Sequence, residues 1–262
     1  MKPTRRSLEG SLLLYVFVLL GLGLAYMRPG LGWLAPISMG ALLAGNVWFW
    51  YREGRPFLGL GLHITGVWYV NLLIGLVVGV ALPVAFILAL AANGLASLRL
   101  VHDSSLMIAI FWLGVVRIVL TVVFEEIVFR GYYLQSFASQ RGIKLAIVLS
   151  SLLWSFLHLP NMLGSHLQIT SIAAGLISFT VLGIALAISF LRTGGLLWFP
   201  FGLHYGYNFA FSSLGALFKT IYHAPAWLVG QPPWVPESGI QGILLSSAIL
   251  ITVYITTNRK QG

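Results

Sequence analysis

Residues 67–92, VWYVNLLIGLVVGVALPVAFILALAA, decide the fold class, because they contain no Asp, Glu, Lys or Arg. About 20 mostly apolar residues are enough for a helix to cross a bilayer. The composition of the whole chain agrees, with 58% hydrophobic and 8% charged residues and a mean hydropathy of +0.92. A soluble domain carries about 25% charged residues. The chain is therefore predicted to be an integral membrane protein.

Further apolar runs predict an all-α, polytopic protein with about eight transmembrane helices in a single bundle over residues 1–262. The other expected spans are 10–27, 31–50, 105–136, 143–160, 168–191, 195–218 and 239–257.

The distribution of basic residues predicts that both termini are cytoplasmic, because cytoplasmic loops carry an excess of Lys and Arg. With that orientation the cytoplasmic segments hold Lys2, Arg5, Arg6, Arg52, Arg55, Arg141, Lys144, Arg192, Arg259 and Lys260, and the outer segments hold Arg28, Arg99 and Lys219. The net charge of +9 is thus explained by topology, and we expect no nucleic-acid partner. The absence of cysteine excludes disulfides, thiolate metal sites and cysteine nucleophiles.

Residues 121–131, TVVFEEIVFRG, place charges inside an expected span, where each costs about 2.5–3.5 kcal/mol on the gentlest scale. Glu126 and Arg130 are four residues apart, so they can form an ion pair on one helix face. Glu125 then points elsewhere without a local partner, as expected of a general base with a raised pKa. The alternative is a purely structural ion-pair network.

Two more polar pairs occupy expected spans. In WSFLH, Trp154 and His158 share a helix face, and in HYGYN, His204 and Asn208 do so. At about 1.5 Å per residue, and for upright helices, Glu125, His158, His204 and Asn208 lie roughly 21, 22, 14 and 20 Å from the cytoplasmic ends. We therefore expect these side chains to share one layer of the membrane.

Two features stay open at this level. Arg117 lies in the middle of a span without an acidic residue four positions away, so it either snorkels to the interface or pairs across the bundle. The outer loop 224–236, APAWLVGQPPWVP, is either an interfacial aromatic belt or a lid over the substrate.

The polar inventory favours hydrolysis by an activated water. Glu125 and His158 would hold and deprotonate the water, and His204 and Asn208 would donate hydrogen bonds to the oxyanion. No cofactor is required. A zinc version with Glu125, His158 and His204 as ligands is also possible, although the sequence has no HExxH motif.

The three motifs, EEIVFR (125–130), WSFLH (154–158) and HYGYN (204–208), resemble those of the CPBP intramembrane proteases, the CAAX protease and bacteriocin-processing family that includes the type II CAAX prenyl endopeptidases. The resemblance covers about residues 105–215, the expected catalytic core. Trp154 departs from it, because the family usually has Phe there, and a larger ring could narrow the substrate pocket.

The resemblance implies a glutamate-dependent intramembrane peptidase, in a family often labelled metalloendopeptidase, in a bacterial or archaeal cell membrane. Its implied partners are the lipid bilayer and a peptide or lipidated-protein substrate, possibly a prenylated CAAX-type C-terminus. Two other functions fit the same residues: a non-catalytic membrane scaffold or immunity protein, and a proton-coupled transporter that uses the Glu/His layer as a relay.

Overall fold

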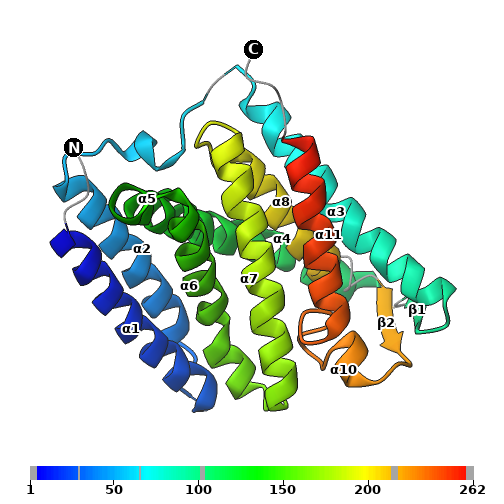
Figure 1. The fold of residues 1–262 in the computed structure, drawn as a ribbon. Helices are drawn as coiled ribbons and strands as arrows, with labels where there is room; N and C mark the ends of the chain where they lie inside the picture. Colours follow the sequence, from blue (N-terminus) through cyan, green and yellow to red (C-terminus); the bar gives the residue numbers. More distant parts are fainter. Residues whose placement is uncertain (1–4, 29, 65, 101–103, 214–217, 258–262) are drawn as a thin grey trace.

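The computed structural model of the chain is a bundle of helices with one small two-stranded sheet (Figure 1). It describes residues 5–28, 30–64, 66–100, 104–213 and 218–257. The elements are α1 (Arg5–Met27), α2 (Leu34–Arg52), η1 (Phe57–Leu60), α3 (Trp68–Ala92), β1 (Ala96–Leu100), α4 (Ser104–Glu126), η2 (Ile127–Leu134), α5 (Gln135–Arg141), α6 (Ile143–Gly164), α7 (Ile169–Arg192), α8 (Trp198–Asn208), η3 (Phe209–Ser213), β2 (Phe218–Tyr222), α10 (Ala226–Val229) and α11 (Ile240–Thr256).

Within the described residues, four helices are long and apolar enough to cross a membrane, namely α1, α3, α6 and α7, and α11 is a shorter apolar helix. The chain is thus a multi-pass, all-α membrane protein in its main features. Each of the eight expected ranges overlaps a helix, while the number of spans stays a prediction. The start of α1 and the end of α11 lie at the same end of the bundle (Figure 1), and that this end is cytoplasmic also stays a prediction.

The strands were not expected from the sequence. β1 pairs antiparallel with β2, with Ala96 opposite Tyr222. The range 195–218 was expected to be one span, but β2 begins within it at Phe218, and its described helical residues are those of α8 and η3.

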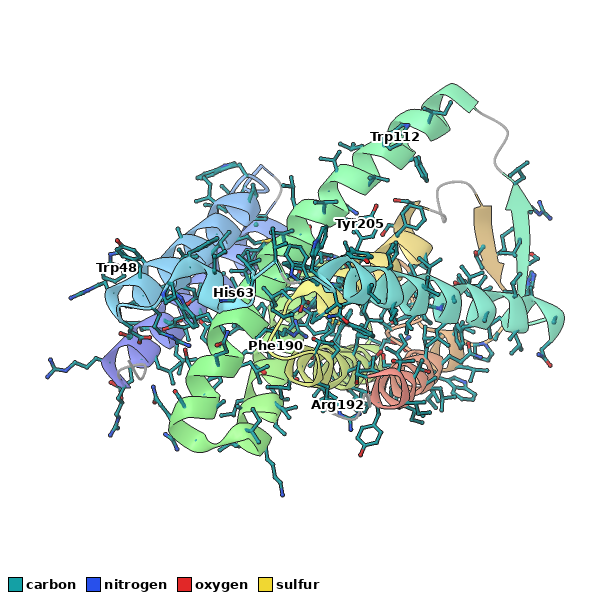
Figure 2. The ribbon with its side chains drawn as sticks, turned by 90° about the horizontal axis from the view of Figure 1, so that it is seen from above. Trp48, His63, Trp112, Phe190, Arg192 and Tyr205 are labelled. Carbon is teal, nitrogen blue, oxygen red and sulfur yellow. The ribbon has the colours of Figure 1, made fainter. Side chains whose placement is uncertain are left out.

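Helix α4 does not run parallel to its neighbours. Seen from above, α7 and α11 point along the line of sight, whereas α4 extends across the view and outward past Trp112 (Figure 2). Its exposed side includes Trp112, Leu113 and Leu120. The upright geometry behind the depth estimate therefore does not hold for α4, and Glu125 reaches the other motifs because its helix crosses theirs.

Helices α3 and α8 approach through glycine on both sides. Gly75 and Gly79 of α3 face Gly202 and Gly206 of α8, each pair four residues apart. A Cβ at Gly79 would lie 2.3 Å from the carbonyl oxygen of Leu203. Small residues at this spacing let membrane helices pack with their backbones almost in contact. This contact holds in place the helix that carries His204 and Asn208.

The two helices that carry acidic and amide motif residues both widen into π-helix just after them. η2 begins directly after Glu126, and η3 begins directly after Asn208. Every residue of η2 is buried. Single π-turns are frequent at functional sites, and they change which side chains share a face.

Candidate active site

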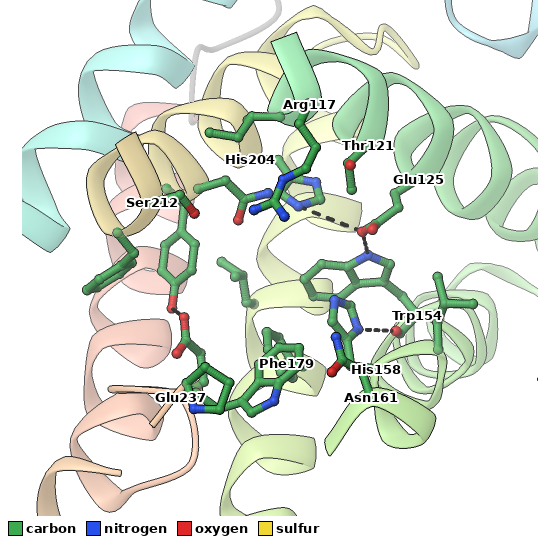
Figure 3. A pocket seen from close by; sticks show the side chains of 18 of the residues that line it. Arg117, Thr121, Glu125, Trp154, His158, Asn161, Phe179, His204, Ser212 and Glu237 are labelled. Atoms are coloured by element: carbon green, nitrogen blue, oxygen red, sulfur yellow. Dashed lines mark hydrogen bonds and ion pairs between the residues drawn. The ribbon is translucent and has the colours of Figure 1, made fainter. Parts of the chain in front are cut away.

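A cavity of about 540 Å³ collects side chains from α4, α6, α7, α8 and the segment before α11 (Figure 3). Among its lining residues are five that the sequence analysis selected: Glu125, Trp154, His158, His204 and Asn208. Glu126 and Arg130 do not line this cavity and lie behind it, 0% and 1% exposed. The three motifs, which are far apart in the sequence, therefore meet at one place.

Glu125 is 4% exposed and has two neighbours from other helices. The indole Nε1 of Trp154 donates a hydrogen bond of 2.5 Å to Glu125 Oε2, and His204 Nε2 lies 3.8 Å from the same oxygen (Figure 3). Glu125 thus lacks a local partner as expected, but the inference that its carboxylate is unpaired is wrong. The reason is that its partners are 29 or more positions along the chain, where helix spacing gives no information.

The contacts of Trp154 show what a Trp does at the position where the family usually has Phe. A phenyl ring cannot donate a hydrogen bond, whereas the indole N–H holds one oxygen of Glu125. The ring further contacts Arg130, whose guanidinium carbon lies 4.8 Å from the ring centroid. The aromatic face near His158 is kept, with ring centroids 5.0 Å apart.

His158 is oriented by its own helix. Its Nδ1 lies 2.9 Å from the carbonyl oxygen of Trp154, and its ring stacks on Phe179 with centroids 4.2 Å apart. Because a carbonyl oxygen only accepts, Nδ1 carries the hydrogen, and Nε2 keeps its lone pair in the neutral ring. His158 can therefore accept a proton or a hydrogen bond through Nε2.

His204, which is 3% exposed, is held by Glu126. Its Nδ1 donates to Glu126 Oε1 at 2.7 Å, and the same oxygen accepts from Arg130 Nη1 at 3.1 Å. The Glu126–Arg130 pair thus exists as the spacing indicates, but Glu126 has a second task that the sequence analysis missed. A carboxylate that accepts from one imidazole nitrogen fixes the orientation of the ring and directs the other nitrogen.

Asn208 ends α8 and lines the cavity. Its side-chain amide has no hydrogen-bond partner in the part of the chain that the structure describes. An amide N–H in such a position is available to a bound molecule.

The segment before α11 closes one wall of the cavity. Pro233, Trp234, Val235 and Glu237 all line it, and the ring centroid of Trp234 lies 6.0 Å from that of His158. Tyr207 donates a hydrogen bond of 2.9 Å to Glu237, which ties this segment to α8. Residues 233–235 of the loop 224–236 are thus part of the pocket wall, as a lid requires, whereas Trp227 earlier in the loop is exposed, as in an aromatic belt.

The zinc version finds no support in the arrangement of donors. Across the described ranges, no three side chains of His, Cys, Asp and Glu are placed as ligands of one metal ion. One oxygen of Glu125 is occupied by the Trp154 indole, and His204 Nδ1 is occupied by Glu126. Neither contact excludes a metal, because a ligating His commonly donates its other N–H to a carboxylate, and the zinc version stays a prediction.

Comparison with known proteins agrees with the motifs. Residues 105–210 match the family model described as type II CAAX prenyl endopeptidase Rce1-like. No curated protein and no solved structure gives a significant match. The matched residues include all three motifs, so the resemblance to the CPBP proteases is confirmed. Residues 105–210, about two fifths of the chain, are therefore similar to the type II CAAX prenyl endopeptidase Rce1-like family.

Proposed function

We propose that the protein is an intramembrane endopeptidase that hydrolyses a peptide bond with a water activated by Glu125 and His158. The observation that carries the proposal is the convergence of Glu125, His158, His204 and Asn208 on one cavity within an Rce1-like domain. Hydrolysis by water requires a general base to activate the water and hydrogen-bond donors for the oxyanion, and these four side chains can supply both around one cavity.

In the proposed reaction a water lies between Glu125 and His158 Nε2. The Glu125 carboxylate takes a proton from the water as its oxygen attacks the carbonyl carbon of the substrate. Glu125 then returns this proton to the leaving nitrogen as the C–N bond breaks. The Trp154 indole keeps one carboxylate oxygen engaged, which directs the other oxygen toward the water.

The oxyanion would be bound by the protonated ring of His204 through Nε2 and by the Asn208 amide. Preorganised donors of this kind are typically worth 10²- to 10³-fold in rate each. Glu126 contacts His204 Nδ1 and Arg130 through the same oxygen and so would hold the imidazole in place. This assigns Glu126 and Arg130 to positioning rather than to chemistry.

The substrate would be a peptide or lipidated protein that enters from the bilayer, with CAAX-type processing of a prenylated C-terminus as the first class to test. The name of the matched family supports this class. A prokaryotic cell membrane is our expected location, and independence from metal is part of the proposal.

The test is cleavage of a fluorogenic peptide with an S-farnesyl cysteine near its C-terminus by the protein in lipid nanodiscs. Glu125→Gln should lower the rate by at least 10³-fold with no loss of folded protein, while Glu9→Gln, an exposed carboxylate on α1, should leave it unchanged. Activity should survive strong chelation. Full cleavage by Glu125→Gln would refute the mechanism, and loss of activity on chelation would restore the zinc version.

The same variants separate the other functions considered from the sequence. A proton-coupled transporter would show proton or solute flux that Glu125→Gln abolishes. A scaffold would keep its binding partner after His158→Ala and His204→Ala.

A further inference from the structure

Arg117 is a cation in the cavity that the proposed mechanism does not use. It lies on α4 within the apolar run GVVRIVL and lines the same cavity as Glu125 and His204. Figure 3 shows its side chain extending from α4 into this space. The sequence left open whether Arg117 snorkels or pairs across the bundle, and the structure shows that it enters the cavity.

No described residue neutralises this charge. Within the described ranges Arg117 forms no ion pair, and its guanidinium makes no hydrogen bond or ring contact there. Its charge acts on Tyr26, a neutral side chain that lines the same cavity. The other arginine of the site, Arg130, is paired with Glu126 and capped by the carbonyl of Gly183. An unpaired guanidinium next to a membrane cavity is a site for an anion, and carboxylates match its fork of N–H donors.

The position of Arg117 relative to the proposed base is set by helix geometry. Arg117, Thr121 and Glu125 are on successive turns of α4, and all three line the cavity. Eight residues of helix separate the first and the last, which corresponds to roughly 12 Å. This is the separation of the two backbones, and both side chains reach into the cavity between them. An extended peptide advances about 3.3 Å per residue, so the two side chains can contact one substrate at points a few residues apart.

We propose that Arg117 binds a carboxylate of the substrate that lies a few residues on the C-terminal side of the cleaved bond. The carboxylate is either the free end of the chain or an acidic side chain at that position. The inference rests on the proposed peptidase function, and it adds a determinant of where the enzyme cuts. A substrate whose end is held by Arg117 presents one particular bond to Glu125.

The test measures binding apart from cleavage. In the Glu125→Gln protein, three fluorescent farnesyl-cysteine peptides are compared: one with a free C-terminal carboxylate, one with a C-terminal amide, and one amide with Asp as last residue. The free acid should bind about 10- to 100-fold more tightly than the plain amide, as expected for one charge-assisted contact. The Asp peptide shows whether a side-chain carboxylate can replace the chain end.

Adding Arg117→Gln should bring the ratio of acid to amide affinity to about one, while Arg117→Lys should keep part of it. Arg141→Gln, at an exposed arginine on α5, is the matched control and should keep the full ratio. Equal affinities for acid and amide in the Glu125→Gln protein, no binding of either, or a ratio that survives Arg117→Gln would each overturn the proposal.

Cleavage by the protein with an intact Glu125 separates the two proposals. Arg117→Gln should raise KM for the free acid far more than it lowers kcat. An acid preference in binding without any cleavage would uphold the role of Arg117 and reject the peptidase function. Cleavage with equal KM values for the acid and amide peptides would uphold the peptidase function and reject the role of Arg117.

Discussion

Glu126→Gln tests whether the second glutamate of the motif is a positioning residue with a large structural effect. Glu126 is fully buried, and its Oε1 accepts from both Arg130 and His204. Its Oε2 is buried without a hydrogen-bond partner in the described part of the chain. The change to Gln keeps the size of the side chain and removes its charge.

The expected loss of stability follows from what remains around Arg130. Arg130 is 1% exposed and would keep only the Gly183 carbonyl, at 3.3 Å, and the ring of Trp154 as close partners. Breaking a buried ion pair by removing one partner costs about 3–5 kcal/mol. The amide nitrogen of Gln would lie either against the two donors or at the unpartnered Oε2 position, which adds to the cost.

Thermal unfolding in detergent, followed by intrinsic fluorescence, is the assay. A loss of about 3 kcal/mol corresponds to a fall in Tm of about 6–12 °C for a chain of this size. Glu125→Gln is the control, because Gln can still accept from Trp154, and its Tm should change by no more than about 3 °C. Equal Tm values for wild type and Glu126→Gln would refute the argument, as would an equally large fall in Glu125→Gln.

Two further predictions concern the frame of the site. Gly79→Ala should lower the free energy of unfolding by about 1–3 kcal/mol and reduce activity, because the new Cβ would meet the backbone of α8 at Leu203. Gly23→Ala is the control and should be neutral or slightly stabilising, because nothing lies within 4 Å of its new Cβ. Unfolding curves and cleavage rates of both variants decide this, and equal behaviour would contradict the close packing. Burial raises the pKa of the Glu237 carboxyl above its ordinary value of 4.5, so the folded state is more stable when this carboxyl is protonated. The stability of the wild type should therefore fall relative to that of Glu237→Gln as the pH rises from about 4.5 through the folded-state pKa of Glu237. A Tm difference between the two proteins that does not change with pH would reject the prediction.

The positions of the helices could be read from the sequence because a bilayer leaves the backbone few choices. Backbone groups in lipid must be hydrogen-bonded within the segment, so a long apolar run forms a helix whatever its neighbours are. The expected ranges 168–191 and 67–92 accordingly coincide with α7 and α3 within a residue or two. The strands β1 and β2 escaped prediction because each has only five residues, too few for the alternation in ASLRL to stand out, and because each is stabilised by pairing with the other.

The candidate site was partly predictable for a similar reason. Polar residues inside apolar helices are costly, so Glu125, His158 and His204 stood out without any knowledge of the fold. Their roles were less accessible. Trp154 was selected for its ring, but its hydrogen bond to Glu125 depends on how α6 meets α4.

The sequence by itself determined the class of protein, the approximate helices and the residues that carry polar groups into the membrane, because hydropathy and helix spacing act over a few neighbouring positions. Only the tertiary structure decided which of these groups meet. Residues 78 positions apart, Glu126 and His204, are joined because α4 crosses the bundle and glycine faces bring α8 against α3. The same crossing places Arg117, which the sequence shows only as a charge within an apolar run, in the lining of the cavity. The sequence does not show this because the direction of a helix depends on every helix packed against it.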